Sequence, residues 1–245
     1  MHEHDEEDDD LIQQDLQLAE LMKRGATMEE IAQLRDPVAS TPEQAVRALK
    51  VGNARFYGGR PLRQGYSPVE RRSQIIGQTP FAVVLGCSDS RVPTEHVFDQ
   101  GPGQIFTIRV AGNVVAPATL GSIEYAVKHL KPHVLVVMGH EGCGAVHAAM
   151  TMTEEQIKAE SEYIQLLISR IGPAVHNIPR IRDSKARMRE AVLASVRQQV
   201  HYLKQNPVVS DAADSGRIAV IGAYYEISSG AVDFLESEED LRLDN

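Results

Sequence analysis

Four short apolar runs constrain the fold of this chain more than any other feature. They occupy residues 81–85, 105–110, 134–138 and 218–221. Each run has the length of a strand and is rich in apolar, mostly β-branched residues. None alternates between apolar and polar positions as a half-exposed antiparallel strand does. Such runs are typical of strands that are buried on both faces of a mostly parallel sheet.

Helical patterns lie around and between these runs. Residues 122–130 suit a crossover helix that ends before Pro132. Thr41, Pro42 and Gln44 supply the cap, the first position and the third position of a helix at the start of the body. Two later apolar faces recur at helical spacing: Ile157, Ile164, Ile168 and Ile171 on one, and Met188, Val192, Val196, Val200 and Leu203 on the other. The alternation predicts an α/β fold with a mostly parallel central sheet flanked by helices.

The first 40 residues differ from the rest. Residues 2–10 are mostly acidic, which predicts a solvated segment. Residues 12–22 carry apolar side chains at helical spacing, and Thr27 with Glu30 matches a capping box for a second short helix. We therefore predict an acidic, helical N-terminal extension over residues 1–40 and a separate domain over residues 41–245.

Composition limits the classes of function. The 245 residues carry a formal net charge of −9 and no basic stripe with interleaved aromatics, which argues against nucleic-acid binding. No apolar run approaches the roughly 20 residues that span a bilayer, and no signal peptide is recognisable. We expect a cytoplasmic protein, either free or inside a bacterial microcompartment, with no membrane partner and with a small or neutral substrate.

The chain has only two cysteines, and each lies in a polar cluster after an apolar run. Cys87 begins the segment Cys-Ser-Asp-Ser-Arg, and Cys143 ends the segment His-Glu-Gly-Cys that starts at His140. Thiolates and imidazole are ligands that Zn²⁺ prefers, and a catalytic zinc site keeps one position for an exchangeable ligand. A closed four-cysteine site is excluded. Cys87, His140 and Cys143 therefore predict an open, reactive zinc site.

Plainer interpretations of these clusters explain less. A disulfide is possible in principle, but nothing in the chain indicates an oxidising compartment. Burial as small apolar residues, the usual state of free cysteines, leaves the neighbouring Asp89 and Arg91 unexplained. The glycines at 139, 142 and 144 do not form the pattern of a dinucleotide- or phosphate-binding loop.

Both clusters are expected at one edge of the sheet. Cys87 closely follows the run 81–85, and His140 follows the run 134–138. The carboxyl ends of parallel strands meet at the edge where open α/β sheets bind their ligands. The two clusters are therefore predicted to converge.

These motifs resemble those of the β-class carbonic anhydrases, zinc enzymes that interconvert carbon dioxide and bicarbonate. The similarity rests on Cys-Ser-Asp-Ser-Arg at 87–91, Ala-Gly-Asn at 111–113, Ser-Ile-Glu-Tyr-Ala-Val at 122–127 and Gly-His-x-x-Cys-Gly-Ala at 139–145. It runs from about residue 41 to residue 235. It implies that the domain over 41–245 is a catalytic lyase domain that forms a homodimer or a larger homo-oligomer.

The resemblance also implies roles for individual residues. The zinc ligands would be Cys87, His140 and Cys143, and the catalytic pair would be Asp89 and Arg91. The residues expected to bind or line the substrate are Gln78, Val92, Phe98, Tyr125 and Gly144. In the family, the glutamine that Gln78 matches often comes from the partner subunit.

The expected reaction is the reversible hydration of CO₂ to bicarbonate and a proton, by attack of zinc-bound hydroxide. Asp89, kept ionised by Arg91, would accept a hydrogen bond from the hydroxide and orient it. In some relatives this Asp leaves its Arg and closes onto zinc, and we predict such a closed form at low pH. The allosteric bicarbonate pocket of other relatives is built partly on a Trp, which this chain lacks.

Two alternative functions stay open at this point. One is a hydrolase of carbonyl sulfide or carbon disulfide, and the other is a catalytically weak zinc-bearing homologue that serves an assembly or cargo. The role of Arg109 is not resolved by the sequence. Surface or structural roles, rather than proton transfer, are expected for six further histidines: His96, His129, His133, His147, His176 and His201.

Overall fold

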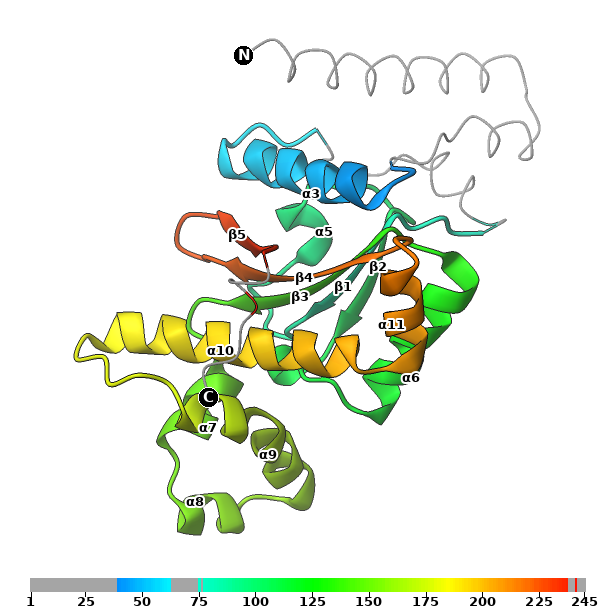
Figure 1. The fold of residues 1–245 in the computed structure, drawn as a ribbon. Coiled ribbons are helices and arrows are strands. Elements are labelled where there is room, and N and C mark those ends of the chain that lie inside the picture. The colour runs from blue at the N-terminus through cyan, green and yellow to red at the C-terminus, as the bar shows by residue number, and fades with distance from the viewer. Residues whose placement is uncertain (1–38, 63–74, 76, 238–240, 242–245) are drawn as a thin grey trace, which may run out of the picture.

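The computed structural model describes residues 39–62, 75, 77–237 and 241. In this part of the chain, helices cover both faces of a central sheet, as Figure 1 shows. The helices expected within the first 40 residues lie outside the described residues. The division into an extension and a domain therefore stays a prediction.

The described sheet has five strands in the order β2-β1-β3-β4-β5. They span Ala82–Gly86 (β1), Ile105–Arg109 (β2), Val134–His140 (β3), Ala219–Tyr225 (β4) and Val232–Leu235 (β5). The first four strands pair in parallel, and β5 runs antiparallel to β4. The predicted α/β class with a mostly parallel sheet is confirmed. β5 has no counterpart among the predicted strands, because it is short, only partly buried and interrupted by Asp233.

Helices from different parts of the chain cover the two faces of the sheet. On one face lie α3 (Pro42–Tyr57) and α5 (Thr94–Val97). On the other lie α6 (Pro117–Tyr125), α7 (Gly144–Thr151), α9 (Glu162–His176), α10 (Ser184–Lys204) and α11 (Pro207–Asp214). Alternate residues of a strand point to opposite faces of the sheet and pack in two separate cores. Val84 packs in the core under α3, the α3 cluster, and Val83 packs in the core under α10, the α10 cluster.

Most of the predicted helices are present. Thr41 caps α3, where its hydroxyl oxygen accepts a hydrogen bond from the backbone N–H of Gln44 at 3.3 Å. The helix predicted over 122–130 begins earlier, at Pro117, and its last turn, Ala126–Leu130 (η2), is a π-helix that stops before Pro132. The predicted α10 face is buried from Val192 to Leu203. None of the described helices is long and apolar enough to cross a membrane.

The apolar face predicted over residues 157–171 is divided between two helices. α8 (Glu154–Ala159) ends at Glu160, and α9 begins after Ser161. Both of these intervening residues have extended backbone angles, with ψ of 165° and 153°. The spacing of the isoleucines is therefore helical on each side of residues 160 and 161, but no single helix axis runs through these two residues.

Gly139 allows α10 to lie directly against β3, one residue before His140. A Cβ atom on Gly139 would lie 2.5 Å from Val192 Cγ1 and 2.7 Å from Val196 Cγ2. Gly222 on β4 faces the same helix, and its Cβ would lie 2.8 Å from Val196 Cγ1. Real Cβ atoms do not approach this closely, so the position of α10 depends on glycine at both sites.

We expect Gly139→Ala to lower the free energy of unfolding by about 1–3 kcal/mol, because the added methyl group overpacks the α10 interface. Chemical denaturation measures this change. Gly121→Ala is the matched control, since Gly121 is exposed on α6 and a Cβ there meets nothing within 4 Å. The control should be neutral or slightly stabilising. Equal stability of the two variants would contradict the close packing described here.

Candidate metal centre

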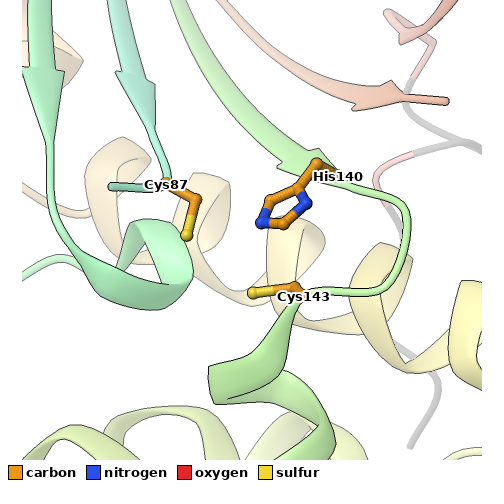
Figure 2. A group of neighbouring side chains, drawn as sticks. All are labelled: Cys87, His140 and Cys143. Carbon is orange, nitrogen blue, oxygen red and sulfur yellow. The ribbon is translucent and has the colours of Figure 1, made fainter. Parts of the chain in front are cut away.

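Cys87, His140 and Cys143 lie together at the carboxyl edge of the sheet. Cys87 directly follows β1, His140 is the last residue of β3, and Cys143 precedes α7. All three are buried, and their ligand atoms lie within 4.8 Å of one another. Figure 2 shows both sulfur atoms and the imidazole ring pointing toward a common centre. The predicted convergence of the two clusters is therefore present.

The imidazole of His140 has one ring nitrogen in use and one free. Its Nδ1 lies 3.0 Å from the backbone carbonyl oxygen of Glu141. Because a carbonyl oxygen only accepts, Nδ1 carries the proton and Nε2 carries the lone pair. Nε2 is buried and has no hydrogen-bond partner among the residues that the structure describes. Buried polar atoms are normally paired, so this free nitrogen fits a metal ligand.

Backbone N–H groups surround both thiols. Cys87 Sγ accepts hydrogen bonds from the backbone N–H groups of Asp89 and Gly112, each at 3.4 Å. The sulfur of Cys143 receives hydrogen bonds from Ala145 and Val146 in the first turn of α7. Positive ends of N–H dipoles stabilise a thiolate, and a thiolate is the form that binds metal.

Each of the two thiols shifts the pKa of the other. A hydrogen bond from the Cys143 thiol, with weaker contributions from the backbone N–H groups of Asp89 and Gly112, lowers the pKa of Cys87, although burial opposes this. The same contact with the Cys87 thiolate, together with burial, raises the pKa of Cys143. A divalent metal bound between them would require both sulfur atoms in the thiolate form.

Asp89 and Arg91 form a bidentate pair beside the ligands. Arg91 Nε donates to Asp89 Oδ1 at 2.9 Å, and Arg91 Nη2 donates to Oδ2 at 2.7 Å. Oδ2 also lies 4.0 Å from His140 Nε2. The side-chain and backbone hydrogen bonds from Arg91 hold the pKa of Asp89 well below its usual range. Asp89 is therefore ionised and is held by Arg91; closure of this carboxylate at low pH stays a prediction.

Known proteins share this arrangement of strands and motifs. A sequence model described as carbonic anhydrase matches residues 82–232. Carbonic anhydrase 2 of Mycobacterium tuberculosis is 38% identical over 192 residues, which cover 78% of this chain and 91% of that protein. One of two tetrameric β-carbonic anhydrases from Sordaria macrospora has a similar structure. Its TM-score is 0.64 at 26% identity, and the match covers 80% of this chain and 98% of that one.

The chain belongs to the β-carbonic anhydrase family.

Arg109 supports the β-carbonic anhydrase motif that contains Cys87. It is the last residue of β2, paired with Gly86 at the end of β1. Its Nε donates to the carbonyl oxygen of Cys87 at 2.9 Å, and its Nη2 donates to that of Asp89 at 2.5 Å. Arg109 therefore holds the backbone of the loop between Cys87 and Asp89. Its place at the end of a strand beside this motif is the signal that could have revealed the role.

Within one chain, the residues expected to line the substrate pocket do not all lie close together. Gly144 directly follows Cys143, and Val92 is fully buried next to Arg91. Gln78 and Tyr125 instead line a separate surface hollow, together with Gly77, Pro102, Gly103 and Leu130. Gln78 precedes β1, whereas Cys87 follows it. Five residues of strand separate these ends by about 17 Å.

Phe98 lies in the core rather than in that hollow. It is fully buried in the α3 cluster, and its ring centroid is 6.1 Å from that of Phe234. The aromatic residue beside Tyr125 is Phe106 of β2, at 6.3 Å between ring centroids. The His129 ring also contacts Tyr125, with 5.1 Å between ring centroids and a tilt of 41°. Phe106, rather than Phe98, is therefore the phenylalanine in contact with Tyr125.

We expect Gly112→Ala to weaken metal binding about 10–100-fold, the usual effect of losing a group that supports a ligand. Gly112 has φ of 65°, and its Cβ would lie 2.7 Å from Ile171 Cδ1. The loop or the buried Ile171 side chain would have to shift, and a shift of the loop would move the N–H of residue 112 away from Cys87 Sγ. Competition with a zinc chelator measures the affinity, with Gly121→Ala as the control. Unchanged affinity would show that this N–H does not support the thiolate.

Proposed function

We propose that this chain catalyses the reversible hydration of carbon dioxide to bicarbonate and a proton, with Zn²⁺ held by Cys87, His140 and Cys143. The observation that carries the proposal is the buried donor set with an ionised carboxylate at its side. The three ligand atoms lie within 4.8 Å of one another, and Asp89 Oδ2 is 4.0 Å from one of them. Membership of the β-carbonic anhydrase family supports the reaction.

The donor set fits zinc. Two thiolates and one imidazole are soft and intermediate ligands, which suit Zn²⁺ better than Mg²⁺ or Ca²⁺. His140 Nε2 has no other partner, and the thiols already lie among N–H groups that favour their ionised form. When bound, Zn²⁺ would act as a Lewis acid that lowers the pKa of a water molecule toward roughly 7.

Asp89 and Arg91 would orient the attacking water. Asp89 is ionised, so its Oδ2 can accept a hydrogen bond from the water but cannot donate one. Arg91 holds the ionised carboxylate through two hydrogen bonds, and Arg109 holds the backbone of the loop that carries it. By accepting a proton of the water at Oδ2, Asp89 would leave an oxygen lone pair free for the substrate carbon. Positioning of this kind lowers the barrier without any change of charge on the protein.

A second copy of the chain would complete the pocket. Gln78 and Tyr125 lie at the opposite end of β1 from Cys87, in a hollow on the surface. Tyr125 is 50% exposed although it is a large aromatic residue. The related Sordaria macrospora enzymes are tetrameric. We therefore propose a homo-oligomer in which these residues face the metal centre of the partner subunit. We also propose that the protein is cytoplasmic.

The first test is stopped-flow CO₂ hydration by reduced, zinc-loaded protein at mildly alkaline pH. The wild type should hydrate CO₂ rapidly, and Cys143→Ser should lose both zinc and activity, because a serine hydroxyl does not replace a thiolate ligand. Ser210→Ala, an ordinary change in α11, is the control. A wild type that binds one zinc per chain but hydrates no CO₂ would contradict the proposal. That result would favour another substrate or a non-catalytic role.

A second test mixes two inactive variants. We expect Gln78→Ala and Cys143→Ser subunits to regain activity when they are unfolded and refolded together. In a mixed dimer, the intact ligands of one subunit would meet the intact Gln78 of the other. Each variant refolded alone is the control. No regained activity, with mixed dimers demonstrated by mass spectrometry, would show that Gln78 does not act across the interface.

A further inference from the structure

The carboxylate of Glu141 connects the metal-binding segment to two other elements. One of its oxygens accepts a hydrogen bond from the backbone N–H of Ser228 at 2.9 Å. The other lies 3.3 Å from Lys185 Nζ. Ser228 follows β4, and Lys185 is in the first turn of α10. The Glu141 side chain is only 21% exposed, although Ser228 itself is exposed. The proposed reaction assigns this side chain no role.

The backbone of the same residue holds a metal ligand. The carbonyl oxygen of Glu141 accepts the hydrogen bond from His140 Nδ1 at 3.0 Å. Its N–H donates to the carbonyl oxygen of Tyr225 at 2.8 Å, at the end of β4. The next residue, Gly142, has φ of 64°. Because the chain turns sharply there, the orientation of the carbonyl depends on the contacts of Glu141 itself.

We propose that Glu141 is a positioning residue for the metal centre. Its carboxylate anchors the residue to Ser228, so that its carbonyl keeps the proton of His140 on Nδ1 and directs Nε2 toward the two thiols. The effect is transmitted from side chain to backbone and then to the ring. The inference rests on the proposed zinc site but not on the identity of the substrate.

The experiment compares three variants of the full-length chain by zinc affinity. Glu141→Ala removes both side-chain contacts and should raise the zinc dissociation constant about 10–100-fold. Glu141→Gln keeps an oxygen that can accept from Ser228, and should stay within about fivefold of the wild type, since it loses only an ion pair with an exposed lysine. Glu154→Ala is the matched control. Glu154 also pairs with a lysine, Lys158 at 3.5 Å, but its side chain is 87% exposed.

Two further measurements separate positioning from a general loss of stability. The unfolding midpoint of the metal-free protein reports stability, and nitrogen NMR of the His140 ring reports where its proton lies. The proposal expects the Nδ1–H form in the wild type and in Glu141→Gln, and a mixture of both forms in Glu141→Ala.

Three outcomes would overturn the inference. Glu141→Ala could bind zinc as tightly as the wild type, or Glu141→Gln could lose as much affinity as Glu141→Ala. Alternatively, the affinity could fall only in proportion to stability, with the ring unchanged. Weak zinc binding by the wild type would overturn the metal site together with this inference. A wild type that binds zinc tightly without hydrating CO₂ would overturn the proposed reaction alone.

Discussion

The parallel pairing of β1 with β3 determines where the groups of the metal centre lie. Gly86 is opposite Met138, so β3 continues two residues beyond the end of β1. His140 is thereby brought beside the loop that carries Cys87. A shift of one residue in this register would turn every side chain of β3 to the other face of the sheet. Because both faces of β3 are buried, its register against β1 determines both the packing of the core and the geometry of the site.

The polar groups of this buried centre suit the binding of a cation. Backbone N–H groups from the loop after β1, from η1 (Ala111–Asn113) and from the first turn of α7 point at the two sulfur atoms. The guanidinium of Arg91 is already paired with Asp89. Burial makes an unpaired thiolate costly, and N–H dipoles offset only part of that cost. A divalent cation is the partner that would satisfy both thiolates and the free imidazole nitrogen.

Several parts of this structure could be predicted because each depends on local sequence. The strands around residues 82–86 and 134–140 are recognisable by their continuous apolar side chains, and the α3 start by Thr41 and Gln44. The placement of Cys87 and His140 follows from the rule that parallel strands share a carboxyl edge. Other parts depend on contacts that are distant in sequence. Both Phe98 and Phe106 lie between Arg91 and Arg109, and only the packing of α5 and β2 shows that Phe98 is in the core. The contact between Glu141 and Ser228 joins residues that no local pattern relates.

Because Gln78 lies at the far end of β1, one chain would be able to fold before its proposed active site is complete. A single folded chain holds Cys87, His140 and Cys143 together with Asp89 and Arg91, so it would be able to take up the proposed metal alone. It cannot bring its own Gln78 to that metal, because the strand between them is rigid and buried. If the glutamine is needed for turnover, specific activity will fall on dilution. The delay between folding of a new chain and its first turnover will then shorten as the protein concentration rises.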